Sequence, residues 1–192
     1  MKFGIRTIAV ATAISAVCCA GYLSFSKSVN RQRQAAKAIV ELGGEIFYDH
    51  EIEERDATPP KWLIDRLGLD VFERLARIDF SRSEIDDIEF LSDLSGVRIL
   101  TLEQTDVCDL SPIASMKSLR ILLLDRTLVN DLAAIQNLTN LHSLYIDDTK
   151  INSLRPLHNL KNLTYLNAFR IPAPQSEFTA LMRALPNLTI NR

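Results

Sequence analysis

Hydrophobic residues recur at a fixed interval of 22 positions through residues 72–192. Four positions of the interval are apolar in every copy, and leucine is the commonest residue among them. Such a period is typical of stacked repeats, each of which buries its apolar side against the next. Two columns hold Leu75, Val97, Leu119, Leu141, Leu163 and Leu185, and Ile78, Leu100, Leu122, Leu144, Leu166 and Leu188. The other two hold Phe80, Leu102, Leu124, Ile146, Ala168 and Ile190, and Phe72, Leu94, Met116, Leu138, Leu160 and Met182.

The order of residues inside one repeat predicts a short strand followed by a turn. Residues 119–124 read Leu-x-x-Leu-x-Leu, and this alternation is typical of a strand with one buried face. A hydroxyl residue follows the strand and can bond the turning backbone. This column contains Ser83, Thr105, Thr127 and Thr149. Pro112 and Pro156 lie in the returning arc and argue against a full helix there.

Residues 105–113, Thr-Asp-Val-Cys-Asp-Leu-Ser-Pro-Ile, carry a recognisable motif. The pattern resembles the leucine-rich-repeat family in its short bacterial form, and it is similar to internalin-type repeats. It departs from many members in placing Thr where they place Asn. The resemblance covers residues 72–192 and implies an α/β solenoid with a parallel concave sheet of about six strands. It also implies a convex side of short irregular or 3-10 segments, and protein binding as the usual activity.

The ends of the solenoid require caps, because a terminal repeat exposes an apolar surface. At the C-terminus, Phe178, Leu181, Met182 and Leu185 fall on one face of an expected helix, and residues 187–190 supply a last strand. Residues 27–71 are expected to be a helical juxtamembrane and N-terminal capping region. It would contain a helix over 28–42, a strand over 45–48 and a helix after Pro59 and Pro60. The rival interpretation, a small independent domain, has few apolar residues for a core.

Residues 1–26 form a separate, apolar segment, with no charged residue from Thr7 to Leu23. The segment suits an uncleaved signal anchor, although it is slightly short for a spanning helix. A cleaved signal peptide and a buried soluble helix remain the alternatives. Basic residues flank both sides, so the positive-inside rule gives a mixed orientation. The expectation is a single-pass membrane protein with the solenoid outside the cytoplasm, or a secreted protein if the signal is cleaved.

The strand residues that alternate with the buried columns are expected to face the concave side. An apolar patch would comprise Ile99, Ile121, Leu123, Tyr145 and Tyr165. An acidic edge of Glu103, Asp125 and Asp147 would border it, with Thr101 and Asn167 completing the face. Apolar centres with charged rims are typical of interfaces, so we expect a protein or peptide partner with apolar and basic groups. The alternative is that such residues simply suit a sheet surface.

The residue types exclude several other functions. A net charge of −2 without a basic stripe argues against nucleic acid. His50, His142 and His158 do not converge, and no phosphate-binding loop or nucleophile motif occurs, so we expect no enzyme, cofactor or small-molecule substrate. A calcium site at Asp125, Asp147 and Asp148 lacks a glycine-bearing loop. Cys108 is the one cysteine outside the apolar segment, which excludes a disulfide framework in the repeats.

Two functions remain after these exclusions. The first is a non-enzymatic protein-interaction module, tethered to a membrane or exported, that binds its partner on the concave face. The alternative is a structural scaffold that associates with itself through the sheet edge at residues 188–190 and has no specific concave ligand.

Overall fold

The computed structural model describes residue 30 and residues 32–48, 75–94 and 96–192 of the chain. The expected anchor or signal in residues 1–26 and the expected helix after Pro59 lie outside these residues. Within the described ranges, no helix has the length and apolar character needed to cross a membrane.

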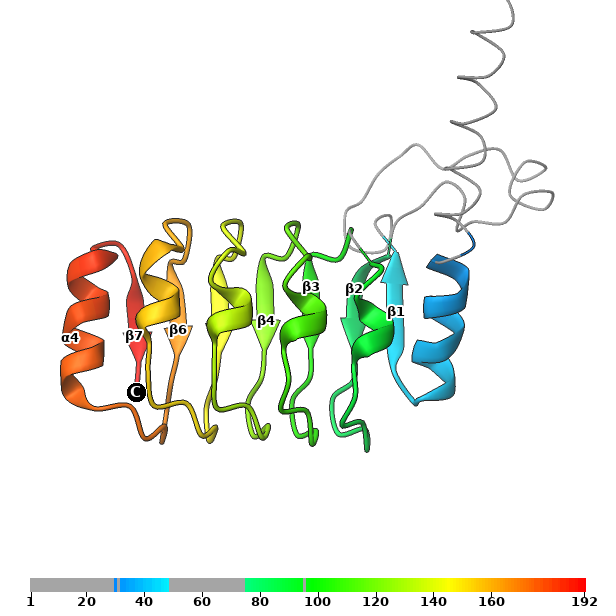
Figure 1. Ribbon diagram of the computed structural model, residues 1–192, viewed down its shortest axis with the longest axis horizontal. Helices are drawn as coiled ribbons and strands as arrows, with labels where there is room; N and C mark the ends of the chain where they lie inside the picture. The colour runs from blue at the N-terminus through cyan, green and yellow to red at the C-terminus, as the bar shows by residue number, and fades with distance from the viewer. Residues whose placement is uncertain (1–29, 31, 49–74, 95) are drawn as a thin grey trace, which may run out of the picture.

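In the described part of the chain, seven strands form one open sheet, in which strand order follows chain order (Figure 1). The strands are β1 (Glu45–Tyr48), β2 (Leu75–Asp79), β3 (Ile99–Thr101), β4 (Ile121–Leu123), β5 (Ser143–Tyr145), β6 (Tyr165–Asn167) and β7 (Thr189–Asn191). Strands β2 to β7 pair in parallel, which confirms the expected sheet of about six strands. Strand β1 was expected as a strand, and the structure adds that it pairs antiparallel with β2.

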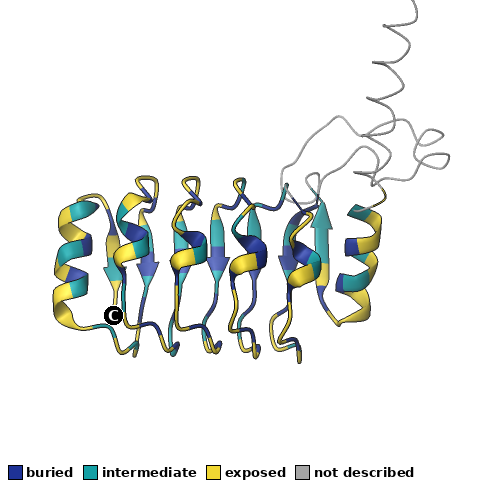
Figure 2. Cartoon of the chain, viewed as in Figure 1, coloured by how far each residue is buried: buried dark blue, intermediate teal, exposed yellow. Residues whose placement is uncertain are grey.

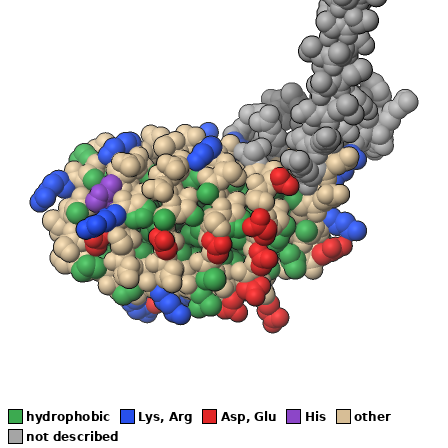
Figure 3. Space-filling view, viewed as in Figure 1, with side chains coloured by type: hydrophobic (Ala, Val, Ile, Leu, Met, Phe, Trp, Pro, Cys, Tyr) green, Lys and Arg blue, Asp and Glu red, His purple; other side chains and the backbone are tan. Residues whose placement is uncertain are grey.

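Short 3-10 segments return the chain on the side of the sheet away from the concave face. They are η2 (Glu89–Leu91), η3 (Ser111–Ile113), η4 (Ala133–Ile135) and η5 (Arg155–Asn159), as the prolines predicted. Asp87, Asp109 and Asp131 each accept a hydrogen bond from the backbone N–H two residues later, which starts η2, η3 and η4. Figure 3 shows acidic side chains at several places on the face in view. These aspartates therefore have a structural role on the convex side.

The repeat columns build one continuous core between the strands and the 3-10 segments (Figure 2). Ser83, Thr105, Thr127 and Thr149 each donate a hydroxyl hydrogen bond to the carbonyl three residues earlier, at 2.7–2.8 Å. This confirms the predicted function of the hydroxyl column. Met182 is a correction, because it is 45% exposed, whereas Leu94, Met116, Leu138 and Leu160 of its column are buried. Phe72, the first residue of that column, lies outside the described residues. Met182 lies in helix α4 (Gln175–Ala184), whose buried residues are Phe178 and Leu181.

Both ends of the described solenoid carry a helix. Residues 32–41 are helical and bury Ala35 and Ile39 against the first repeat. Helix α4 (Gln175–Ala184) buries Phe178 and Leu181, and Leu185 directly after it, as the sequence predicted. At α4, Glu177 accepts hydrogen bonds from the Ser153 hydroxyl and the Leu154 N–H. The helix is thereby joined to the preceding repeat by polar contacts as well as by apolar packing.

Candidate functional site

Parallel pairing brings the predicted face residues together on neighbouring strands. Ile99 pairs with Ile121, Leu123 pairs with Tyr145, and Tyr145 pairs with Asn167. All members of the apolar patch are half-buried, so each presents part of its side chain to solvent. The patch therefore exists as one surface that crosses β3, β4, β5 and β6.

Thr101 is an exception within the predicted face, because only 4% of its surface is exposed. Its register partners are Asp79 on β2 and Leu123 on β4, both larger residues. The short side chain is covered by its neighbours, although it points in the direction that the alternation predicted. Thr101 thus supports the face and offers little area to a partner.

The two tyrosines of the patch lie side by side. The ring centroids of Tyr145 and Tyr165 are 5.3 Å apart, and the ring planes are inclined by 45°. Desolvation raises the pKa of the Tyr145 phenol, with further contributions from Tyr165, Asp125 and Glu103. The phenol consequently keeps its proton at physiological pH and can donate a hydrogen bond to a ligand.

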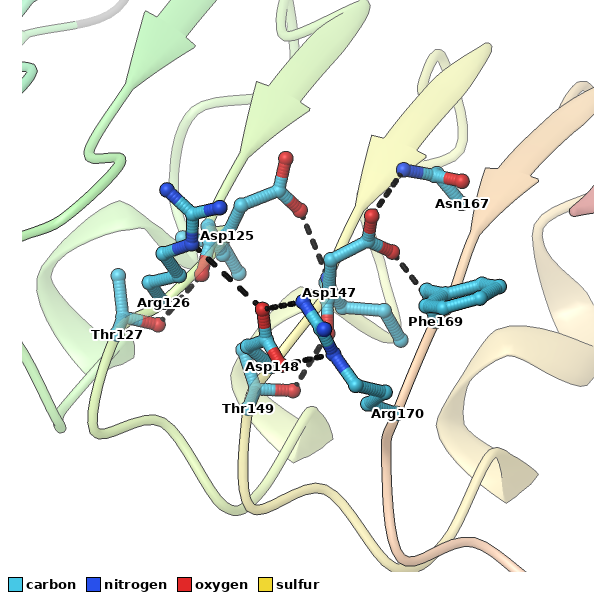
Figure 4. Close-up of polar contacts among 11 residues, drawn as sticks. Asp125, Arg126, Thr127, Asp147, Asp148, Thr149, Asn167, Phe169 and Arg170 are labelled. Carbon is cyan, nitrogen blue, oxygen red and sulfur yellow. Dashed lines mark hydrogen bonds and ion pairs between the residues drawn. The ribbon is translucent and has the colours of Figure 1, made fainter. Parts of the chain in front are cut away.

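The acidic edge is not uniform, because its members differ in their hydrogen bonds. Asp147 uses both carboxylate oxygens: Oδ1 accepts from the Phe169 N–H at 2.6 Å and Oδ2 accepts from the Asn167 amide at 2.5 Å (Figure 4). Asp125 uses only Oδ1, which accepts from the Asp147 N–H at 2.7 Å. No hydrogen bond or ion pair joins Glu103 to another of the described residues. Asp147 therefore has a structural role. The Glu103 carboxylate and one oxygen of Asp125 accept no hydrogen bond from the described residues and can accept one from a ligand.

The position of Asp125 makes its charge unfavourable in the isolated chain. Burial is the largest cause that raises the pKa of Asp125, to about 6, and the charges of Asp147 and Glu103 act in the same direction. The Asp147 N–H and Arg126 lower the pKa but do not compensate. A substantial fraction of Asp125 is therefore protonated near pH 6.

Arg126 and Arg170 lie near the acidic edge but form their ion pairs with Asp148. Asp148 accepts hydrogen bonds from Arg170 at 2.5–2.6 Å and lies 3.6 Å from the Arg126 guanidinium (Figure 4). The Arg170 hydrogen bond is the largest cause that lowers the pKa of Asp148. Arg170 also lies over the Phe169 ring, 5.5 Å from its centroid. This cluster forms a separate rim beyond the acidic edge.

Asp148, Arg126 and Arg170 belong to a column of five residues that share a backbone conformation, which the sequence analysis did not predict. Each follows the acidic-edge position of its own repeat, and each has a left-handed conformation with φ between 55° and 63°. The set is Arg82, Gln104, Arg126, Asp148 and Arg170. Such a conformation usually signals Gly or Asn, and neither occurs here. The signal in the sequence is the 22-residue recurrence of this position, which directly precedes the hydroxyl residue in the first four repeats, whereas Arg170 precedes Ile171.

The structure also places the groups that were considered for other chemistry. Among the described residues, no group of three or more His, Cys, Asp or Glu side chains could hold a metal ion. Of the aspartates that were considered for calcium and rejected, Asp147 accepts hydrogen bonds on both oxygens from Phe169 and Asn167, and Asp148 accepts them from Arg170. His142 precedes β5, whereas His158 lies in η5 on the convex side, and Cys108 is exposed.

No protein-family model matches the sequence, and no curated protein matches it either. Solved structures do resemble it. A leucine-rich-repeat protein of Leptospira interrogans has 23% identity and a TM-score of 0.53 over 57% of this chain and 29% of that chain. Internalin C2 of Listeria monocytogenes has 25% identity and a TM-score of 0.47 over 60% of each chain. A second Listeria monocytogenes internalin has 26% identity and a TM-score of 0.44 over 57% of this chain and 40% of that chain.

The match spans less than two thirds of each of these bacterial chains. At 23% identity, the similarity to the Leptospira protein shows the fold alone. The parallel sheet and the 3-10 segments of this chain are consistent with that fold. These observations show that the chain has a leucine-rich-repeat solenoid fold, similar to that of the Leptospira protein.

Proposed function

We propose that the solenoid is a non-enzymatic protein-interaction module that binds a protein or peptide partner on its concave face. The observation that carries this proposal is the partly exposed apolar patch, continuous over four paired strands and bordered by open carboxylates. Apolar area next to polar groups gains free energy when a partner removes it from water. Tyrosine suits such a surface, because its ring packs while its hydroxyl donates a hydrogen bond.

We also propose that residues 1–26 tether the chain to a membrane or direct its export, with the solenoid outside the cytoplasm. Support comes from the uncharged stretch from Thr7 to Leu23 behind a basic start. Protease added to intact cells that express the full-length chain tests the orientation. Degradation of the solenoid, or its release into the medium, is expected. Membrane retention with protection from protease would contradict the external placement.

The binding proposal is tested by the double variant Leu123→Ser/Tyr145→Ser, which reduces the apolar patch and leaves the buried columns intact. Proteins captured by the full-length chain are quantified by mass spectrometry for the native and variant forms. We expect the specific partner to be lost from the variant. The matched control is Leu128→Ser/Met182→Ser, since these side chains are 43% and 45% exposed and lie outside the patch.

Circular dichroism and thermal melting of all forms establish that each variant is folded. Equal capture by the native chain and the double variant would overturn the concave assignment. The alternative function, self-assembly through residues 188–190, has a different signature. It would give concentration-dependent sedimentation of the purified chain without any partner, and that sedimentation would persist in the double variant.

A further inference from the structure

We propose that Glu103 and Asp125 together receive one basic side chain of the partner, an arginine or a lysine, at the border between the apolar patch and the acidic edge. The inference rests on the proposed function, because it assigns the recognition chemistry of the same concave face. It divides the acidic edge into Glu103 and Asp125, which keep carboxylate oxygens for a ligand, and Asp147, which uses both oxygens within the fold.

The two carboxylates are placed for a shared ligand. Glu103 and Asp125 occupy the same position of consecutive repeats, and the Gln104 N–H donates to the Asp125 backbone carbonyl at 2.9 Å. Neighbouring strands lie about 4.8 Å apart, so a guanidinium or ammonium group can reach both side chains. Figure 4 shows that the second carboxylate oxygen of Asp125 has no contact with the other residues drawn.

Among the described residues, the arginines near the acidic edge already have acidic partners. Arg126 and Arg170 are both engaged by Asp148, and Arg77 is hydrogen-bonded to Asp79 at 2.6 Å. Within the described ranges, no ion pair neutralises Glu103 or Asp125. Glu103 and Asp125 are both half-buried, so their adjacent carboxylates repel each other and favour an external cation that contacts both.

The apolar patch completes the recognition of such a side chain. Tyr145 adjoins Leu123 on the neighbouring strand, and its phenol experiences the charges of both Asp125 and Glu103. The methylene stem of arginine or lysine can therefore pack on the tyrosine while its charged group contacts the carboxylates. A neutral polar side chain would satisfy neither the charge nor the packing. The surface thus favours a partner segment with a basic residue flanked by apolar residues.

The protonation of Asp125 in the absence of a ligand provides an independent test of the proposed contact. Asp125 faces Asp147 from the next repeat, Glu103 from the previous repeat, Tyr145 on β5 and Arg126 in its own turn. A bound cation lowers the pKa of Asp125 from about 6, so binding releases a proton. Affinity is expected to fall about tenfold between pH 7 and pH 5, and most of this dependence should disappear in Asp125→Asn.

The experiment selects binding peptides from a displayed library of random twelve-residue peptides on the full-length chain at pH 7.5. Enriched peptides are synthesised, and their dissociation constants are measured for the native chain, Glu103→Gln, Asp125→Asn and the control Asp106→Asn. Asp106 is exposed and lies outside the concave face, so its variant removes the same charge elsewhere. Replacing the basic residue of each peptide by citrulline or norleucine tests the ligand side.

We expect enrichment of arginine or lysine beside apolar residues, at least tenfold weaker binding to Glu103→Gln and Asp125→Asn, and unchanged binding to Asp106→Asn. Peptides that lose affinity for Leu123→Ser/Tyr145→Ser but bind both carboxylate variants normally would overturn this inference and leave the proposed function standing. Peptides that bind the native chain and all these variants with equal affinity would count against both this inference and the proposed function. The absence of any enriched peptide would count against both as well.

Discussion

The carboxylate of Asp125 accepts a hydrogen bond from the backbone N–H of Asp147, at 2.7 Å, across the 22 residues that separate neighbouring repeats. Asp147 repeats the contact with the Phe169 N–H at 2.6 Å. Each aspartate thus holds the backbone of the repeat that follows it, beyond the last residue of the short strand. The same column therefore stabilises the stack and borders the apolar patch.

Asp147→Ala should destabilise the fold, because it removes both contacts and leaves the Phe169 N–H and the Asn167 amide without their acceptor. The expected loss is about 2 kcal/mol of unfolding free energy. Urea denaturation measures it. Asp106→Ala, in an exposed turn, is the control and should lie within about 0.5 kcal/mol of the native chain. An Asp147 variant as stable as this control would show that the two contacts contribute nothing.

Asp125→Asn should raise stability at pH 7.5 by about 1 kcal/mol, since it removes a half-buried charge and keeps an acceptor for the Asp147 N–H. The pKa of Asp125 in the folded chain, about 6, lies above its ordinary value of 3.8. The folded state therefore binds more protons between these values, and native stability from this group rises as pH falls through 6. The advantage of the variant should vanish by pH 4 in denaturation series, and an advantage independent of pH would contradict this origin.

Glu177→Gln should weaken the C-terminal cap at neutral pH. The Leu154 N–H is the largest cause that lowers the pKa of Glu177, and the Ser153 hydroxyl and Arg155 act in the same direction. A lowered pKa contributes stability that is present above the ordinary value and is lost as pH falls through the folded value. We expect a cost of about 1 kcal/mol at pH 7 and a smaller cost at pH 3, below the ordinary pKa of a glutamate. Thermal melting at both pH values measures it, and an equal cost at pH 3 would point to packing instead of charge.

Gly44→Ala should loosen the N-terminal helix from the first repeat. A Cβ atom at Gly44 would lie 2.5 Å from the Phe80 ring and 2.8 Å from the Ile39 side chain, both buried. The expected destabilisation is about 1–3 kcal/mol, the usual range for overpacking. Hydrogen exchange should detect faster opening of residues 32–41, while the central repeats keep their protection. Unchanged exchange in this helix would mean that the ring moves aside without cost.

Much of the fold could be predicted because stacking imposes the same burial on each repeat. Leu122 and Leu144 are both buried because they occupy the same inward position of consecutive repeats, and the 22-residue interval predicts this position. The hydroxyl of Thr127 was also predictable, since its acceptor lies three residues away in the same turn. Thr101 and Met182 escaped prediction because their exposure depends on what neighbouring strands or further repeats cover.

By itself, then, the sequence determined the repeat length, the inward face of each strand, the hydroxyl turn and the residues of the apolar patch. These follow from alternation and local hydrogen bonding, which act over a few positions. Only the tertiary structure decided which carboxylates are structural and which remain open. Asp147 and Glu103 occupy equivalent positions of their repeats, yet Asp147 is saturated by Phe169 and Asn167 while Glu103 is not. That difference arises between side chains and backbones about 22 residues apart, whose contacts exist only once the repeats are stacked.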